Sequence, residues 1–455
     1  MDKYLFQMKY HLISSLIIGI VVLMASCQIN VNKSSQDPNL KYLPYSTKSS
    51  DRQISRDDYQ EHLEGFWLGE CIANWTGLIT EMDKIGGTGL DGRGAGFYTR
   101  ADWAGPDGPS IWQDEAPQRK IDYYLDPPDS IWGADDDTDI EYIYQSLLYQ
   151  NQTSVLSGEQ IRDGWLAHIK PEEENFLWVS NQRAFDLMKS GMVPPATSDP
   201  ENNPDYDMID AQLTTEIFGL FAPGRPDIAL KMAYLPIRTT ASGQADDIAE
   251  FYVIMHSLAS VTDPDWTMDE KINWLAREAR KHLDNSSYPA RMYDFVESLH
   301  QEGIPWEAAR DSLYEKYQVR QADGYEWATK EPVCHGCFAA GINFGASIIS
   351  LLYGEGDLKE TIKIGALSGW DSDNPTSTWG GLLGFMIGRD GVEKAFGRPL
   401  ASHFNIHRTR IGFPQNGLDN FQAMAQKGIF ITDRVIQEEM HGGVDLLKGI
   451  WYIPE

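Results

Sequence analysis

Two acidic runs in this 455-residue chain have the residue types and the spacing that metal chemistry requires. The first run holds three consecutive carboxylates and the second holds two carboxylates separated by one residue: Asp135, Asp136 and Asp137, then Asp371 and Asp373. Carboxylates this close repel one another, and a hard divalent cation with oxygen ligands relieves the repulsion. We therefore predict that the two runs converge on one metal centre, although they lie far apart in the sequence.

The first run also has an ordinary structural interpretation. Apolar residues recur at helical spacing over residues 140–148, directly after the acidic run. Acidic side chains are common at the start of a helix, because the free N–H groups and the helix dipole favour negative charge there. From this segment alone, helix capping and metal binding both remain open.

The elements that must position these carboxylates are expected to be helices. Further segments with the apolar spacing of amphipathic helices are 207–221, 227–234, 245–259, 267–283, 290–302, 306–317, 338–353 and 357–368. Strand signals are sparse, and the best of them are residues 176–180 and 428–432. We therefore expect an all-α fold.

Two of the helical segments carry stripes of small residues. At a spacing of four, the stripes are Gly65, Gly69, Ala73 and Gly77, and then Gly380, Gly384 and Gly388. Each glycine costs a helix about 1 kcal/mol relative to alanine. The packing that a whole stripe of glycines permits must therefore offset this loss of helix stability. Small stripes let helix backbones approach closely, and the polar residues Glu70 and Asn74 argue against a transmembrane pair. We predict two central, tightly packed helices of a soluble bundle.

A long segment rich in glycine, proline, aspartate and aromatic residues spans residues 86–130. Loops of this length are usually functional or disordered, and the aromatic residues disfavour disorder. We interpret the segment as a lid or a substrate-facing loop. The alternative is a structured elaboration of the surface.

The charge of the chain limits its partners. The formal net charge is −29, which repels phosphate backbones, so we expect no nucleic-acid partner. An anionic ligand would need a local cation. The length and the 42% hydrophobic content are enough for one large domain or two ordinary ones.

The N-terminus resembles a lipoprotein signal. Lysines precede an apolar run at residues 12–26, and small residues stand before Cys27 as in a lipobox. We predict a signal peptide at 1–26, a lipid on Cys27, a polar linker over 27–55 and a folded domain over 56–455. The lipid would be the protein's only membrane attachment, on the periplasmic or outer face of the cell envelope. A plain membrane anchor and an ordinary secretory signal are the alternatives.

The remaining cysteines are too few for a disulfide framework. Cys334 and Cys337 form the sequence CHGC, and Cys71 stands alone. A redox pair or half of a metal site is conceivable for CHGC, but no second cysteine pair exists to complete a zinc site. We favour a structural pair of thiols or one local disulfide.

Three segments, taken together, resemble the ADP-ribosylglycohydrolase family, which includes dinitrogenase reductase-activating glycohydrolase. They are GFWLGECIANWTGLITE at 65–81, ADDDTDIEYIYQSLL at 134–148 and GEGDLKETIKIGALSGWDSDNPTSTWGGLLGFMIG at 354–388. The resemblance covers roughly residues 60–400 and agrees in order and spacing. It implies an orthogonal helical bundle around a binuclear magnesium site.

The resemblance also implies which residues hold the two ions. The motif positions of the family map to Asp135, Asp136, Asp137, Asp371, Asp373 and Asn374. Asp135 stands where the family usually has threonine, and Asn374 stands where it has threonine or cysteine. Both substituted side chains still present oxygen. The acidic residue after the first glycine-rich helix maps to Glu81.

Substrate contacts are implied less completely. Asp210 and Gln212 lie in a segment that resembles an Ile-Asp-Ala-Gln motif of one branch of the family, which makes them candidates for the pocket. A histidine-bearing motif that usually follows is replaced here by TASG at 240–243. His335 is a further candidate for substrate binding, and a structural role for it is the alternative.

The implied reaction is hydrolysis of a glycosidic bond. Two magnesium ions would bind the vicinal hydroxyls of a furanose and polarise a water molecule. Glu81, Asp136 or Asp373 would act as general base. An ADP-ribose-like N- or O-ribosyl bond is the first substrate hypothesis, and export makes another furanosyl or glycan linkage the second. A lipoprotein that binds ligand or metal without turnover is the third.

Overall fold

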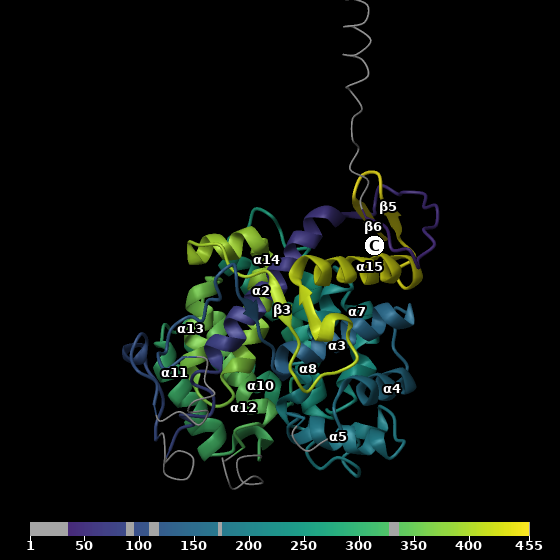
Figure 1. Ribbon diagram of the computed structural model, residues 1–455. Helices are drawn as coiled ribbons and strands as arrows, with labels where there is room; N and C mark the ends of the chain where they lie inside the picture. Colours follow the sequence, from purple (N-terminus) through teal and green to yellow (C-terminus); the bar gives the residue numbers. More distant parts are fainter. Residues whose placement is uncertain (1–34, 88–94, 109–117, 172–174, 327–335, 455) are drawn as a thin grey trace, which may run out of the picture.

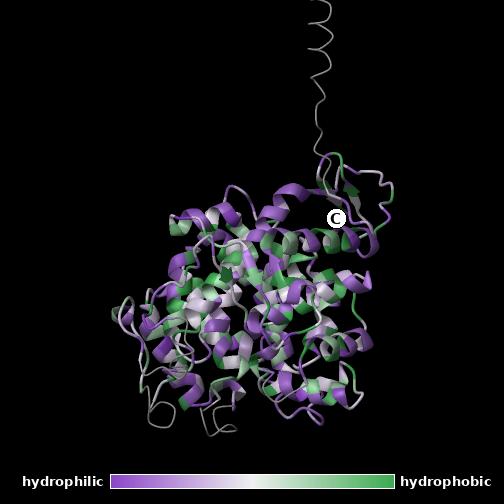
Figure 2. Ribbon diagram, viewed as in Figure 1, coloured by the Kyte–Doolittle hydropathy of each residue, from purple (hydrophilic) through white to green (hydrophobic). Residues whose placement is uncertain are grey.

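Helices make up most of the described protein, as the sequence predicts (Figure 1). The structure is a computed structural model that describes residues 35–87, 95–108, 118–171, 175–326 and 336–454. The helices are α2 (Arg56–Gly77), α3 (Asp136–Asn151), α4 (Gly158–His168), α5 (Val179–Lys189), α6 (Ile217–Leu220), α7 (Pro226–Ile237), α8 (Gln244–Ala259), α9 (Met268–Arg280), α10 (Tyr288–Gln301), α11 (Trp306–Leu313), α12 (Ala340–Tyr353), α13 (Leu358–Ser368), α14 (Asp373–Phe396) and α15 (Phe421–Glu438). Hydrophobic residues gather between the helices and hydrophilic ones on their outer faces (Figure 2).

Three local predictions are wrong. Residues 428–432, predicted as a strand, lie inside α15, and residues 176–180 end in the first turn of α5. Short apolar runs fit a strand and a buried helix equally well, and here packing decides. The helix predicted over 207–221 is mostly turns, with a 3₁₀ turn at Ile209–Ala211 and the short α6.

The two stripes of small residues pack against each other, as predicted. A Cβ atom added to Gly384 would lie 2.2 Å from the carbonyl oxygen of Gly65, and one added to Gly69 would lie 2.2 Å from that of Gly380. Gly77 meets the start of α14, where an added Cβ would lie 2.4 Å from the Cα of Asp373. The helices α2 and α14 therefore run antiparallel with their backbones in contact. This contact brings the C-terminal end of α2 to the N-terminal end of α14.

Two small sheets complete the fold. One has the order β2 (Ile131–Trp132), β3 (His403–Asn405) and β4 (Leu418–Asn420), in which β2 and β3 are parallel. This sheet fixes the chain just before the first acidic run. The other sheet has the order β1 (Arg52–Ser55), β6 (Ile450–Ile453) and β5 (Gly443–Asp445), and it lies near α15 at one end of the molecule (Figure 1).

Residues before position 56 also pack against the body of the protein. Tyr42 donates a hydrogen bond to Asp433 of α15 at 2.7 Å, and Asp37 is buried. Arg56 forms a buried ion pair with Asp433 at 2.9 Å. The polar segment predicted as a linker up to residue 55 is thus packed from about residue 37 onward, and its last four residues are β1.

The described parts of the segment 86–130 pack closely against the helices. Arg310 of α11 donates to the carbonyl of Tyr98 at 2.6 Å, and Tyr123 donates to the carbonyl of Lys359 at 2.8 Å. Phe97 contacts Trp370, with ring centroids 4.9 Å apart. These contacts support a structured elaboration next to the second acidic run more than a free lid.

Two further observations concern cysteines and membranes. Cys337 is disulfide-bonded, and Cys71 is a free, buried thiol. None of the described helices is long and apolar enough to cross a bilayer.

Candidate metal centre

The two acidic runs meet where three helix ends converge. The first run begins α3 and the second begins α14, while Glu81 follows the end of α2. The backbone contact of α2 with α14 explains how Glu81 reaches the second run. We call the set Glu81, Asp135, Asp136, Asp137, Asp371 and Asp373 the acidic centre.

Five of its carboxylates form two overlapping groups. In the first group, Glu81, Asp371 and Asp373 each offer an oxygen within 4.8 Å of the others. In the second, Asp135 and Asp137 do the same with Asp373. Asp373 belongs to both groups, so the prediction that the two runs converge is confirmed. Asp136 belongs to neither group, although its charge acts on Asp371 and Asp373.

Helix capping does not account for these carboxylates. Asp135 occupies the position before α3, but its side chain makes no capping hydrogen bond. Both of its carboxylate oxygens, and Oδ1 of Asp373, are buried and lack a hydrogen-bond partner. Buried polar atoms normally have partners, so these oxygens are suited to a ligand. Oxygen donors of this kind are what a hard divalent cation prefers, and the residues fit such an ion.

Burial raises the pKa of every aspartate in the acidic centre, and repulsion between carboxylates adds to the shift for all of them except Asp136. For Asp135, Asp137 and Asp373 the pKa lies well above the ordinary value, first because of desolvation and then because of neighbouring carboxylates. The pKa of Asp371 rises to about 7, mainly through desolvation and then through the charge of Asp136. A bound cation would lower these pKa values again, because it stabilises the ionised carboxylates.

A buried arginine lies behind the first run. Arg410 pairs with Asp139 through its Nε at 2.8 Å, and both side chains are almost fully buried. Desolvation raises the pKa of Asp139 to about 7 and also raises that of Asp136, while Arg410 opposes both shifts. The sequence interpretation missed Arg410, because a lone arginine distant from both runs carries no local signal.

Asn374 takes part in a chain of side chains. Its Nδ2 faces Oδ1 of Asp137 at 3.5 Å, and its Oδ1 accepts a hydrogen bond from Gln212 Nε2 at 3.1 Å. The amide oxygen predicted as a metal ligand is therefore turned toward Gln212. Asn374 thus orients Asp137 and Gln212. Its amide oxygen keeps a second lone pair, so the ligand role expected from the sequence stays a prediction.

The two candidate pocket residues differ in their surroundings. The carboxylate of Asp210 accepts from the hydroxyl of Ser180 at 2.5 Å and from the backbone N–H of Asn181 at 3.0 Å. It thus holds the start of α5 close to the acidic centre. Gln212, in contrast, has a buried Oε1 without a hydrogen-bond partner. Of the remaining candidates, His335 and Cys27 lie outside the described residues.

A second set of buried acids lies on the same helices. We call Glu70 of α2, Glu141 of α3 and Glu216, just before α6, the glutamate cluster. Thr378 donates to Glu216 at 2.8 Å, and the N–H of Ile217 donates to Glu141 at 2.9 Å. Desolvation raises the pKa of each of the three. The sequence interpretation missed this cluster, because single glutamates on helices are usually exposed.

The fold and the site define a helical protein with a buried, carboxylate-rich centre that can hold a divalent cation. The model of the family described as ADP-ribosylglycohydrolase matches residues 55–420, and the chain belongs to this family. A solved structure titled "ADP-ribosylglycohydrolase-related protein complex" is similar with a TM-score of 0.47 and 16% identity, over 83% of this chain and 99% of that one. No curated protein matches the chain. Membership of the family implies a hydrolase that acts on glycosyl bonds.

Proposed function

We propose that the protein is a magnesium-dependent glycohydrolase that cleaves an N- or O-ribosyl bond in an ADP-ribose-like substrate. The observation that carries the proposal is the position of Asp373, whose carboxylate is shared by two groups of metal-binding oxygens. Two overlapping groups suit two adjacent ions, with Asp373 between them. When bound, magnesium would polarise a water molecule and bind the vicinal hydroxyls of the sugar.

The side chains of the protein have distinct tasks in this proposal. We assign Glu81 the role of general base, because it is buried beside Asp371 and Asp373 and can accept a proton from the attacking water. The negative carboxylates also stabilise positive charge on the sugar as the glycosidic bond breaks. Gln212 offers its unpartnered Oε1 to a sugar hydroxyl. Asp136 is an alternative base, since it is part of the acidic centre but belongs to neither group of metal-binding oxygens.

A different furanosyl or glycan bond is the second candidate for the substrate. The apolar N-terminal run before Cys27 favours it, because a lipid-anchored protein of the cell envelope would not meet cytosolic ADP-ribosylated proteins. We propose this location together with the lipid on Cys27. A ligand-binding lipoprotein without turnover is the remaining candidate.

A hydrolysis screen tests the proposal. The protein is incubated with ADP-ribosyl substrates and with aryl furanosides, each with magnesium and with EDTA. We expect turnover in magnesium that EDTA abolishes, and the cleaved substrate decides between the two linkages. The Asp371→Asn variant should lose both turnover and stabilisation by magnesium in thermal unfolding.

The matched control is Glu216→Gln, which changes a buried acid outside the acidic centre and should keep the magnesium response. Magnesium binding without any turnover would favour the binding lipoprotein. Turnover that persists in EDTA and in Asp371→Asn would refute the metal-dependent mechanism.

A further inference from the structure

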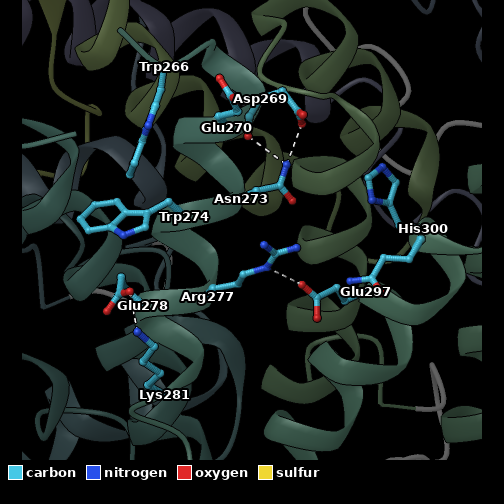
Figure 3. A pocket seen from close by; sticks show the side chains of 11 residues that line it. Trp266, Asp269, Glu270, Asn273, Trp274, Arg277, Glu278, Lys281, Glu297 and His300 are labelled. Carbon is cyan, nitrogen blue, oxygen red and sulfur yellow. Dashed lines mark hydrogen bonds and ion pairs between the residues drawn. The ribbon is translucent and has the colours of Figure 1, made fainter. Parts of the chain in front are cut away.

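A surface groove lies between α9 and α10, on elements that contribute nothing to the acidic centre. Its volume is about 620 Å³, which is within the usual range for small-molecule sites. Figure 3 shows the side chains that line it, most of them from α9 and the turn before it. The α9 residues point to one side of the helix because they recur at helical spacing from Asp269 to Lys281.

Two tryptophans form one end of the groove. The rings of Trp266 and Trp274 lie 5.8 Å apart at 58°, and both side chains remain partly exposed (Figure 3). Large indole surfaces open to water are costly, and inclined aromatic faces of this kind suit the C–H faces of a sugar ring. Trp274 also packs against the hydrophobic core, whereas Trp266 does not.

Polar groups next to the tryptophans are held in place with bonding capacity to spare. Asn273 donates its amide hydrogens to the carbonyl and the carboxylate of Asp269, at 2.9 and 2.7 Å, which leaves its carbonyl oxygen for a ligand. Arg277 uses Nε to bind Glu297 of α10 at 2.9 Å, which leaves its two terminal nitrogens as donors. Acceptors and donors beside aromatic faces match the hydroxyl groups of a saccharide.

The walls of the groove are already fixed by bonds within and between the two helices. Thr267 and Glu270 form a capping box at the start of α9. The ion pairs of Arg277 with Glu297 and of Arg280 with Asp294 join α9 to α10. A groove that is formed before binding loses less ordering entropy when a ligand enters.

The charges of the groove narrow the class of ligand. Four acidic residues and two basic ones line it, which gives a formal charge of −4 + 2 = −2: Asp269, Glu270, Glu278 and Glu297, with Arg277 and Lys281. The excess of carboxylates disfavours phosphates and other anions. Arg277 and Lys281 neutralise Glu297 and Glu278 in ion pairs, and Asp269 and Glu270 accept hydrogen bonds from Asn273 and Thr267, so no free pair of carboxylates is left to hold a cation. A neutral, hydroxyl-rich ligand remains.

We propose that the groove between α9 and α10 is a binding site for a neutral saccharide, separate from the acidic centre. The aromatic pair would pack against one sugar ring while Asn273 and Arg277 bind its hydroxyls. This site does not depend on the proposed hydrolytic activity, since it would hold a glycan whether or not the acidic centre cleaves one.

Affinity electrophoresis of the full protein tests the proposal. Native gels contain arabinan, xylan, dextran or the anionic polymer polygalacturonate. We expect slower migration in at least one neutral polysaccharide and none in polygalacturonate. Trp266→Ala should weaken the interaction by about tenfold or more, because it removes one aromatic face. Trp266 is the residue to change because the core does not depend on it.

The matched control is Tyr234→Ala, which removes an exposed aromatic side chain from α7. This control should migrate like the unchanged protein, and Arg277→Ala should weaken binding without removing an aromatic ring. Hydrolysis of a small soluble substrate should be the same in Trp266→Ala as in the unchanged protein. No retardation in any neutral polymer, equal retardation of Trp266→Ala, or retardation in polygalacturonate would overturn the proposal.

Discussion

The acidic centre and the glutamate cluster are both buried sets of carboxylates positioned by α2, α3 and neighbouring helices, yet their surroundings differ. In the glutamate cluster, Glu216 and Glu141 accept hydrogen bonds from Thr378 and from the N–H of Ile217. Oε2 of Glu70 and Oε2 of Glu141 are nevertheless buried without a hydrogen-bond partner. Oxygens of Asp135 and Asp373 in the acidic centre also lack a partner. The acidic centre differs because two sets of its oxygens lie within 4.8 Å of one another.

The comparison shows that buried acids alone do not define a metal site. Desolvation raises the pKa of all three glutamates, which favours their uncharged form. Among the described residues, the groups of carboxylates close enough to hold an ion are both in the acidic centre. Their position at the starts of α3 and α14 also favours negative charge, because helix N-termini are electropositive. Carboxylates grouped at helix starts can therefore bind metal, whereas the three buried glutamates form no such group and can stay protonated.

The largest effect is expected from a substitution in the acidic centre, because only this set of carboxylates should respond to magnesium. Asp373→Ala removes the carboxylate shared by both groups, so kcat/KM should fall on the order of 10³-fold. Magnesium should no longer raise the melting temperature. The metal-free protein should be no less stable than the unchanged one, because one source of repulsion is gone. Calorimetry with and without magnesium measures this, and an unchanged magnesium shift would contradict the assignment.

The second largest effect is expected at the backbone contact of α2 with α14, which positions both sets of carboxylates. Gly384→Ala places a methyl group against the carbonyl oxygen of Gly65, and backbone atoms cannot move aside cheaply. The free energy of unfolding should fall by about 3 kcal/mol. Gly391→Ala is the comparison on the same helix: its Cβ would lie 2.8 Å from the Cβ of Ile387, one turn away, and would meet no backbone of another helix, so a smaller loss is expected. Urea denaturation compares the two, and equal losses would rule out a special role for the contact.

The smallest effect concerns the titration of the glutamate cluster. Desolvation raises the pKa of Glu216 from 4.5 to about 7 in the folded protein. Between these values the folded chain holds a proton that the unfolded chain has released, so this group stabilises the fold at low pH. Its contribution disappears as the pH rises to about 7, with a slope of up to about 1.4 kcal/mol per pH unit.

Glu216→Gln cannot titrate, so its stability should fall less between pH 5 and pH 7 than that of the unchanged protein. Denaturant unfolding at several pH values measures the slope. Glu302→Gln, at the exposed end of α10, is the control and should keep the original slope. A Glu216→Gln variant with the same slope as the unchanged protein would show that Glu216 is not the group responsible.

The sequence predicted the features that depend on side-chain size and local periodicity. Gly69 and Gly384 mark the contact of α2 with α14 because no larger side chain fits there. Apolar spacing located most of the helices to within a few residues. The convergence of Asp137 with Asp373 was predicted because closely spaced carboxylates need a common partner, and the family resemblance agreed with it.

Features set by tertiary packing could not be predicted in the same way. The helix α3 was expected to have an exposed polar face, but Glu141 and Gln145 on it are buried. Arg410 reaches Asp139 from a loop that no local pattern connects with it. The orientation of the Asn374 amide depends on Gln212, so the residue type alone did not reveal its role. The catalytic assignments of Glu81 and Asp136 remain predictions.

The packing of residues 37–55 has a mechanical consequence. Force applied to the amino end of the chain would load the contacts of Ser35, Asp37 and Tyr42 with α15 before the rest of the described protein. It would then reach the hydrogen bonds between β1 and β6 and the buried pair of Arg56 with Asp433. These bonds join the start of the chain to its last helix and strand. Tension would thus be carried by the terminal elements before it reached α2, leaving the carboxylates at the other end of that helix undisturbed.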